Sequence, residues 1–222
     1  MPKAIHHEID LLIFDLDGTL IDTRQDLANA VNYAAQQLGK KPLSLEQVTR
    51  LVGDGVRTFF VHAFEGESEA TLAEALKFFR QFYAEHLADH SRLYPRMREV
   101  LAHFHAQKKA VLSNKPQEFT LSLLQRLDLH TSFEIIIGGS PDFPLKPDPQ
   151  ALQAILQKLQ TPAGRALMIG DGENDILVGQ AAGVKTCAVT YGFRPAEKLL
   201  ALQPDFVAHA PQDLIDFFRA FR

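Results

Sequence analysis

The chain has 222 residues, of which 46% are hydrophobic and 23% are charged, a length and composition that suit one large or two small globular domains. The net charge of −4 and the lack of a basic run speak against nucleic acid and anionic membranes as partners, and the single cysteine, Cys187, excludes an intramolecular disulfide. The sequence has no apolar run of about 18 residues and no apolar signal segment, so we expect a cytoplasmic protein without a membrane helix.

Short apolar runs alternate along the chain with longer segments of helical periodicity. The runs expected to form strands are 11–14, 110–112, 133–137, 166–169 and 184–189, with a weaker candidate at 206–208. The helical patterns cover roughly 97–107, 117–127, 149–159 and 173–182, with a last helix from Pro211. Apolar strands without polar alternation are typical of a parallel sheet that is covered on both faces. This order predicts an α/β fold, a doubly wound Rossmann-like parallel sheet whose ligands bind at the carboxyl ends of the strands.

One stretch interrupts the alternation. From about residue 24 to residue 91 the periodicity is helical only, with a long helix expected over 71–87. We therefore expect an all-α helical cap domain at 22–92, inserted into an α/β core formed by 1–21 and 93–222. Two connections between two compact bodies would form a hinge.

Two aspartates, Asp15 and Asp17, stand directly after the first apolar run. Residues two apart in an extended chain point to the same side, so both carboxylates should face one space. At a separation of about 4 Å they would repel each other by roughly 4 kcal/mol at an effective dielectric of 20. A divalent cation, a lysine or a shared proton could offset this repulsion. Gly18 permits a tight turn whose backbone amides can face an anion.

A second acidic segment, with Asp171 and Asp175, follows the run at 166–169. Asp171 stands at the end of the expected strand, whereas Asp175 falls in the first turn of the expected helix, where a carboxylate also serves as a cap. Clusters of oxygen ligands without cysteine or histidine favour magnesium over zinc.

Neutral and positive groups follow two further strands. The Ser113 hydroxyl and the Asn114 amide can donate hydrogen bonds to phosphate oxygens. Lys146 stands between a loop and a helix start, and Pro147 favours an extended backbone there. Taken alone, a lysine in such a loop is more often exposed to solvent.

In this order the segments resemble the four motifs of the haloacid dehalogenase superfamily of phosphohydrolases, and the resemblance covers nearly the whole chain. The matching residues are Asp15-Leu16-Asp17-Gly18-Thr19, Ser113, Lys146, and Gly170-Asp171 with Asp175. The resemblance implies that Asp15 attacks phosphorus to give an aspartyl-phosphate. It implies that Asp17 protonates the leaving alcohol and then activates water. An aspartate at this second position looks like phosphate-ester chemistry and argues against carbon–halogen cleavage.

The resemblance also implies a set of ligands. Magnesium would be held by Asp15, by the backbone carbonyl of Asp17 and by Asp171, while Asp175 supports the metal and Lys146. The groups expected to bind the transferring phosphoryl group are Ser113, Lys146, Gly18 and Thr19.

The whole-chain pattern is similar to that of phosphoglycolate phosphatases, notably at 51–57 within the expected cap. In caps of this type the matching loop reaches the substrate, so Arg57 is a candidate for binding a substrate carboxylate. We therefore expect a monomer or homodimer that hydrolyses 2-phosphoglycolate and whose partner is this small phosphorylated metabolite. The alternatives are a β-phosphoglucomutase-like phosphomutase, a phosphatase for sugar phosphates or pyrophosphate, and a non-enzymatic phospho-receiver.

Overall fold

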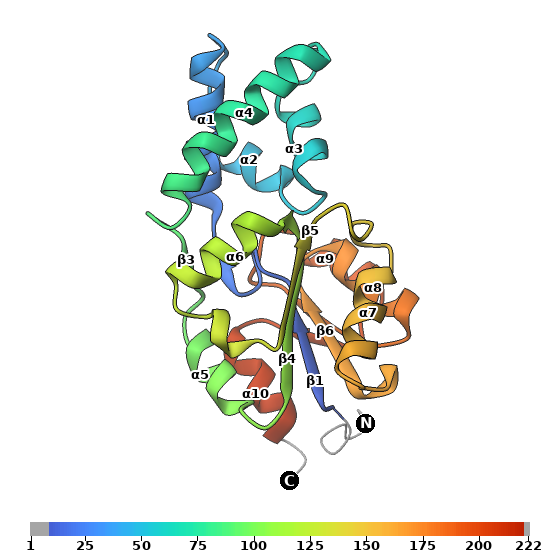
Figure 1. Cartoon of the computed structure of the whole chain (residues 1–222). Helices are drawn as coiled ribbons and strands as arrows, with labels where there is room; N and C mark the ends of the chain where they lie inside the picture. Colours follow the sequence, from blue (N-terminus) through green and yellow to red (C-terminus); the bar gives the residue numbers. More distant parts are fainter. Residues whose placement is uncertain (1–8, 220–222) are drawn as a thin grey trace.

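The computed structural model describes residues 9–219, and its centre is a six-stranded parallel sheet (Figure 1). The strands are β1 (Leu11–Phe14), β4 (Lys108–Pro116), β5 (Ile135–Gly139), β6 (Ala166–Gly170), β7 (Lys185–Val189) and β8 (Phe206–Ala208). Their spatial order is β5-β4-β1-β6-β7-β8, which is the order of a Rossmann sheet. The expectation of a doubly wound α/β core is therefore confirmed.

Helices cover both faces of the sheet. They are α5 (Met97–His103), α6 (Gln117–Arg126), α7 (Gln150–Lys158), α8 (Glu173–Ala182), α9 (Ala196–Ala201) and α10 (Pro211–Arg219). Strand β1 shows why its sequence is apolar throughout: Leu12 and Phe14 pack in the cluster that includes α5 and α6, whereas Leu11 and Ile13 pack in the cluster that includes α7. Alternate side chains of a strand point to opposite faces, so a central strand has no polar side.

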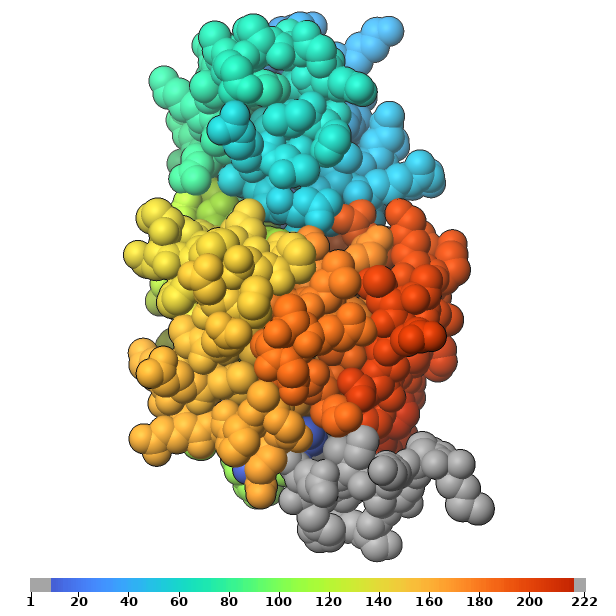
Figure 2. All heavy atoms as spheres, turned by 90° about the vertical axis from the view of Figure 1, so that its right-hand side faces the viewer, coloured from blue at the N-terminus to red at the C-terminus, as the bar shows by residue number. Residues whose placement is uncertain are grey.

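Between β1 and β4 the chain forms a helical segment above the carboxyl end of the sheet (Figure 1). It contains α1 (Arg24–Gln37), α2 (Leu45–Leu51), α3 (Val56–Ala63) and α4 (Glu69–His86). The chain enters through β2 (Ile21–Asp22) and returns through β3 (Arg92–Leu93), which pair antiparallel. Figure 2 shows the helical segment, in cyan, resting directly on the yellow and orange parts of the core. The division of the chain at residues 22 and 92 stays a prediction, and residues 1–8 and 220–222 of the expected core lie outside the described residues.

Several elements differ from the sequence prediction. Strand β4 runs on to Pro116, because Ser113, Asn114 and Lys115 continue the extended chain although they are polar. Strand β5 begins at Ile135 rather than at residue 133, and α9 was not expected at all. Within the described part of the chain, none of the helices has the length and apolar character that crossing a bilayer requires.

Candidate active site

The candidate site is a cavity between the carboxyl edge of the sheet and the helical segment, the edge where ligands bind in this kind of sheet. Its volume is about 80 Å³, well below the ~300 Å³ at which pockets for drug-sized ligands begin. The sheet side contributes mainly Asp15, Asp17, Ser113, Asn114, Lys115, Lys146, Asp171 and Asp175. The helical side contributes mainly Leu27, Leu51, Val52, Val56, Phe59, Phe79 and Tyr83. The space therefore suits a small molecule with one polar and one apolar end.

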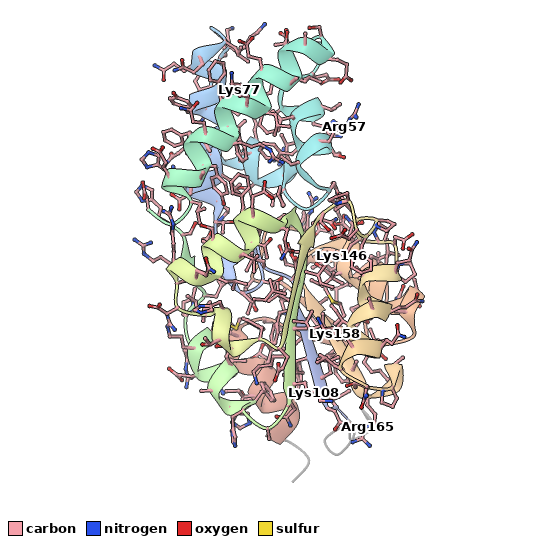
Figure 3. The ribbon with its side chains drawn as sticks, viewed as in Figure 1. Arg57, Lys77, Lys108, Lys146, Lys158 and Arg165 are labelled. Atoms are coloured by element: carbon pink, nitrogen blue, oxygen red, sulfur yellow. The ribbon has the colours of Figure 1, made fainter. Side chains whose placement is uncertain are left out.

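Lys146 joins two carboxylates of this cavity. Its ammonium donates to Asp15 Oδ1 at 2.8 Å, to Asp175 Oδ1 at 2.6 Å and to the carbonyl oxygen of Leu112 at 2.8 Å. Burial lowers the pKa of this ammonium, but the charges of Asp15 and Asp175 outweigh the effect and hold its pKa above the usual value. A charged lysine with three acceptors fixes both carboxylates in position. Figure 3 shows Lys146 at the level where the core meets the helical segment.

Asp175 has the two roles that its place in the sequence suggested. Besides binding Lys146, its Oδ2 accepts a hydrogen bond at 2.9 Å from the amide of Gly172, which precedes α8. Burial raises the pKa of Asp175 to about 6, and Lys146 opposes this rise. The residue thus caps the helix while it holds the lysine of the cavity.

Asp171 follows β6 and is held by neutral donors. The Thr19 hydroxyl donates to its Oδ1 at 2.9 Å and the Phe193 amide to its Oδ2 at 2.7 Å. Burial, together with the charges of Asp15 and Asp175, raises the pKa of Asp171 well above its usual value. No ion pair to Asp171 is found among the described residues. This carboxylate therefore lies in a place where a cation would be favourable.

The chemistry of the cluster fits a divalent cation. Asp15, Asp171 and Asp175 offer one oxygen each within 4.8 Å of one another, and oxygen ligands are those that magnesium prefers. The side chain of Asp17 is not in this group, and the expected role of its backbone carbonyl as a ligand stays a prediction. These three carboxylates are the groups that would hold the metal.

Gly18 and Thr19 both contact Asp171 in this structure, and their expected binding of the phosphoryl group stays a prediction. The Gly18 amide already donates to the carbonyl oxygen of Ile21 at 2.9 Å. Gly18 has a φ of +86°, and a Cβ there would lie 2.2 Å from Asp171 Oδ2. A side chain therefore does not fit at position 18, because the Asp171 carboxylate packs directly against the backbone of the turn. The Thr19 hydroxyl donates to the same carboxylate.

Asp17 has a partner that sequence reasoning missed. The ammonium of Lys115 lies 3.1 Å and 3.0 Å from its two carboxylate oxygens, and the Thr23 hydroxyl donates to its Oδ1 at 2.8 Å. Lys115 also donates to the hydroxyl of Tyr83, on α4, at 2.7 Å. Burial lowers the pKa of Lys115, but the charge of Asp17 and the nearby Tyr83 outweigh this and hold it above the usual value. A lysine thus offsets the charge of each aspartate of the pair: Lys146 beside Asp15, and Lys115 beside Asp17.

Ser113 and Asn114 both line the cavity, but their side chains differ in their hydrogen-bond partners. The Asn114 amide group donates to the carbonyl oxygens of Gly53 and Lys146, both at 2.9 Å, and its oxygen accepts from the Lys146 amide at 2.8 Å. Asn114 is therefore occupied by protein groups and connects the core to the helical segment. The Ser113 hydroxyl accepts only a long 3.4 Å contact from the Lys115 amide among the described residues, which leaves it able to donate into the cavity.

Three core side chains hold the loop between α2 and α3. Besides Asn114, the Asn174 amide donates to Asp54 Oδ1 at 2.7 Å. The guanidinium of Arg194 lies 3.3 Å from Asp54 Oδ2 and donates to the carbonyl oxygen of Arg50. These contacts come from the end of β4, the first turn of α8 and the loop after β7. The helical segment is therefore tied to the same edge of the sheet that forms the site.

Arg57 does not reach the cavity. Its side chain is 82% exposed, and its guanidinium lies 3.5 Å from Glu69. Figure 3 shows it on the outer side of α3, away from Lys146. The neighbouring residues Val56 and Phe59 take the inward positions of this helix, and Arg57 is not among the residues that line the cavity.

Lys115 and Arg194 carry no signal that marks them clearly in the sequence. Lysine and arginine are mostly exposed, so burial of either is not the first expectation. Lys115 does stand two residues after Ser113, at the polar end of an apolar run, and that position could have singled it out. Nothing comparable distinguishes Arg194.

Comparisons with known proteins give the family. A model of the family described as haloacid dehalogenase-like hydrolase matches residues 12–189. The chain is 40% identical over 218 residues to a phosphoglycolate phosphatase from Photobacterium profundum, covering 94% of this chain and 95% of that protein. It is 36% identical over 218 residues to a phosphoglycolate phosphatase from Vibrio parahaemolyticus, covering 94% and 96%.

The fold leads to the same family. The crystal structure of a predicted phosphoglycolate phosphatase from Haemophilus somnus superposes with a TM-score of 0.88 at 26% identity, covering 94% of this chain and 97% of that one. The resemblance that the four motifs suggested is thus confirmed, and the protein is a hydrolase. With its parallel sheet, its four motif segments around one cavity and these relatives, the chain belongs to the family of haloacid dehalogenase-like hydrolases.

Proposed function

We propose that this protein is a magnesium-dependent phosphomonoester hydrolase that acts through an aspartyl-phosphate on Asp15, with 2-phosphoglycolate as its substrate. The observation that carries the proposal is the meeting of Asp15, Asp17, Lys146 and a cluster of three carboxylates in one small cavity. Relatives at 36–40% identity over 94% of the chain bear the name phosphoglycolate phosphatase, which supports the choice of substrate.

Asp15 is suited to attack phosphorus. Lys146 holds one of its oxygens at 2.8 Å, which fixes the carboxylate and leaves its second oxygen for the substrate. A positioned carboxylate can form a covalent phosphoryl intermediate and so divide hydrolysis into two easier steps. The charge of the transferring group spreads over three oxygens. In this proposal the Ser113 hydroxyl donates to that group, and Lys146, which lines the same cavity, contributes its positive charge.

Asp17 is suited to move the proton. It faces the same cavity as Asp15 but lies outside the three-carboxylate cluster. An alkoxide leaving group needs a proton, and a carboxyl group at hydrogen-bonding distance from the ester oxygen can supply it. The same group, once ionised, can accept a proton from the water that attacks the aspartyl-phosphate.

Magnesium would be held by Asp15, Asp171 and Asp175. When bound there it would neutralise part of the phosphoryl charge. The residues of the chain position the ligands: Thr19 and the Phe193 amide orient Asp171, and Lys146 joins Asp15 to Asp175. The helical segment above the site excludes bulk water from these groups.

The test is phosphate release from 2-phosphoglycolate beside a panel of sugar phosphates and pyrophosphate, with magnesium and with a chelator. The proposal expects release that needs magnesium, prefers 2-phosphoglycolate and is lost in Asp15→Asn. A matched control is Asp128→Asn, an exposed aspartate outside the site whose φ of +54° suits asparagine.

Each outcome of the panel bears on one part of the proposal. Equal release from sugar phosphates would remove the substrate and keep the hydrolase. Phosphoryl transfer between sugar hydroxyls would favour the phosphomutase alternative. Full turnover by Asp15→Asn would overturn the nucleophile.

A further inference from the structure

Three cationic side chains line the cavity: Lys115, Lys146 and Arg194. Lys146 donates to three separate acceptors at 2.6–2.8 Å, so its three hydrogen atoms are all used. Arg194 contacts Asp54 and Glu173 and donates to a backbone carbonyl of the helical segment. Both of these cations are engaged by the protein itself.

Lys115 differs from the other two cations in its hydrogen-bond capacity. Its ammonium has two partner groups, the single carboxylate of Asp17 and the hydroxyl of Tyr83. The two Asp17 oxygens belong to one carboxylate and can share a single hydrogen of the ammonium. In that arrangement one of the three ammonium hydrogens is available for a further acceptor group. The side chain is 3% exposed, and that acceptor must therefore come from the cavity.

The side chains around Lys115 limit which chemical group of a substrate could accept its hydrogen bond. The cavity that Lys115 lines has an apolar part, which includes Val56, Phe59, Phe79 and Phe119. Hydroxyl groups of a sugar would be buried against these side chains without partners, which is unfavourable. A short leaving group with a single anionic substituent would instead place that substituent beside the Lys115 ammonium, which can donate a hydrogen bond to it.

We propose that Lys115 is the residue that selects the leaving group, by binding a carboxylate carried one carbon away from the ester oxygen. The substrate class is then the phosphate esters of short 2-hydroxy acids. This inference rests on the proposed function, in which Asp17 approaches the ester oxygen. The ammonium of Lys115 lies 3.0–3.1 Å from the carboxylate oxygens of Asp17. When Asp17 contacts the ester oxygen of the substrate, this ammonium can therefore reach a group carried on the carbon next to the ester oxygen. Arg57, which the sequence suggested for this task, lies outside the cavity.

The experiment compares two substrates that differ only in the carboxylate: 2-phosphoglycolate and ethyl phosphate, in which a methyl group replaces it. We expect the wild type to prefer 2-phosphoglycolate in kcat/KM by at least about tenfold, because a hydrogen bond to a charged group is lost with ethyl phosphate. In Lys115→Met this preference should fall by about 10- to 100-fold. The ratio of the two substrates on one preparation is independent of how much of the variant is folded.

Two further variants help to separate binding of the substrate carboxylate by Lys115 from positioning of Asp17 by the same lysine. Tyr83→Phe removes the other partner of Lys115 but keeps the ammonium, and its preference should stay within about threefold of the wild type. Lys77→Met, an exposed lysine on the same helix as Tyr83, is the control for loss of a positive charge. An equal loss for both substrates in Lys115→Met means that the lysine only positions Asp17, which would overturn the inference.

The wild type alone distinguishes failure of this inference from failure of the proposed function. If it hydrolyses both substrates without preference, the inference is wrong and the hydrolase stands. If it releases phosphate from neither, the proposed function fails and the inference fails with it.

Discussion

Replacing Asp171 by asparagine should stabilise the metal-free protein although it removes a ligand of the proposed metal. Asp171 is buried beside Asp15 and Asp175, and no described cation pairs with it. Asparagine keeps the shape of the side chain. Its oxygen can accept from the Phe193 amide while its NH2 group donates to the Thr19 hydroxyl, which can accept as well as donate. The substitution therefore removes a charge and keeps a partner for the Phe193 amide and for the Thr19 hydroxyl, although the hydroxyl then accepts where it had donated.

The magnitude follows from the spacing of the charges. Two unit charges no more than 4.8 Å apart repel by at least about 3.5 kcal/mol at an effective dielectric of 20. Lys146 offsets part of this, so we expect the free energy of unfolding to rise by about 2 kcal/mol. For a chain of this size that raises Tm by about 4–8 °C. Because the pKa of Asp171 is raised in the folded state, the gain is present at neutral pH and vanishes as the pH falls to the ordinary range of aspartate.

The assay is thermal unfolding in a chelator at about pH 7.5, with Asp26→Asn as the matched control. Asp26 is also a buried aspartate, but its carboxylate accepts from the His90 amide and from the amide and hydroxyl of Ser91. An NH2 group would face these donors, so this variant should lose about 1–3 kcal/mol. If Asp171→Asn loses stability to the same degree, the cluster is not repulsive and the argument for a cation there is refuted.

Three other predictions concern the metal, the loop contacts and the exposed arginine. Since burial raises the pKa of Asp175 to about 6 from an ordinary 3.8, protons compete with magnesium there; the rise in Tm that magnesium causes should shrink between about pH 7.5 and pH 5, and a constant rise would contradict this. Arg194→Gln loses the ion pair to Asp54 and should raise KM by about 3- to 10-fold with a smaller change in kcat, as steady-state kinetics would show; an unchanged KM would mean that the contact does not hold the helical segment closed. Arg57→Gln should change KM for 2-phosphoglycolate by less than about twofold, and a tenfold rise would return this residue to the substrate.

The fold could be predicted because the central strands are apolar on both faces. Leu11 to Phe14 alternate between two cores, so the run has no polar position to obscure it. Helix α9 could not be predicted in this way, since only Leu199 of its six residues is buried and an apolar face needs more than one turn. The polar end of β4 was missed because Ser113, Asn114 and Lys115 form an irregular stretch between the pairs that Leu112 and Pro116 make with β5, and composition does not mark such a stretch as strand.

The position of a site side chain could be predicted where the spacing of residues along the chain decides which way it points. It could not be predicted where contacts with distant parts of the chain decide this. Asp15 and Asp17 stand two residues apart directly after β1, and both line the cavity. The position of Lys115 depends on how Tyr83 on α4 docks above it, which the sequence does not contain. The direction in which the Arg57 side chain points depends likewise on how α3 is rotated relative to the core. In the structure Val56 of this helix lines the cavity, and Arg57 does not.

The measurement that tests the account most directly is the location of the phosphoryl group during turnover. The wild-type enzyme would be mixed with magnesium and 2-phosphoglycolate, quenched in acid within its first turnovers, digested and read by mass spectrometry. The account predicts a phosphoryl group on Asp15, formed only with magnesium and absent from Asp15→Asn. A phosphoryl group on another residue, or steady hydrolysis by Asp15→Asn, would contradict it.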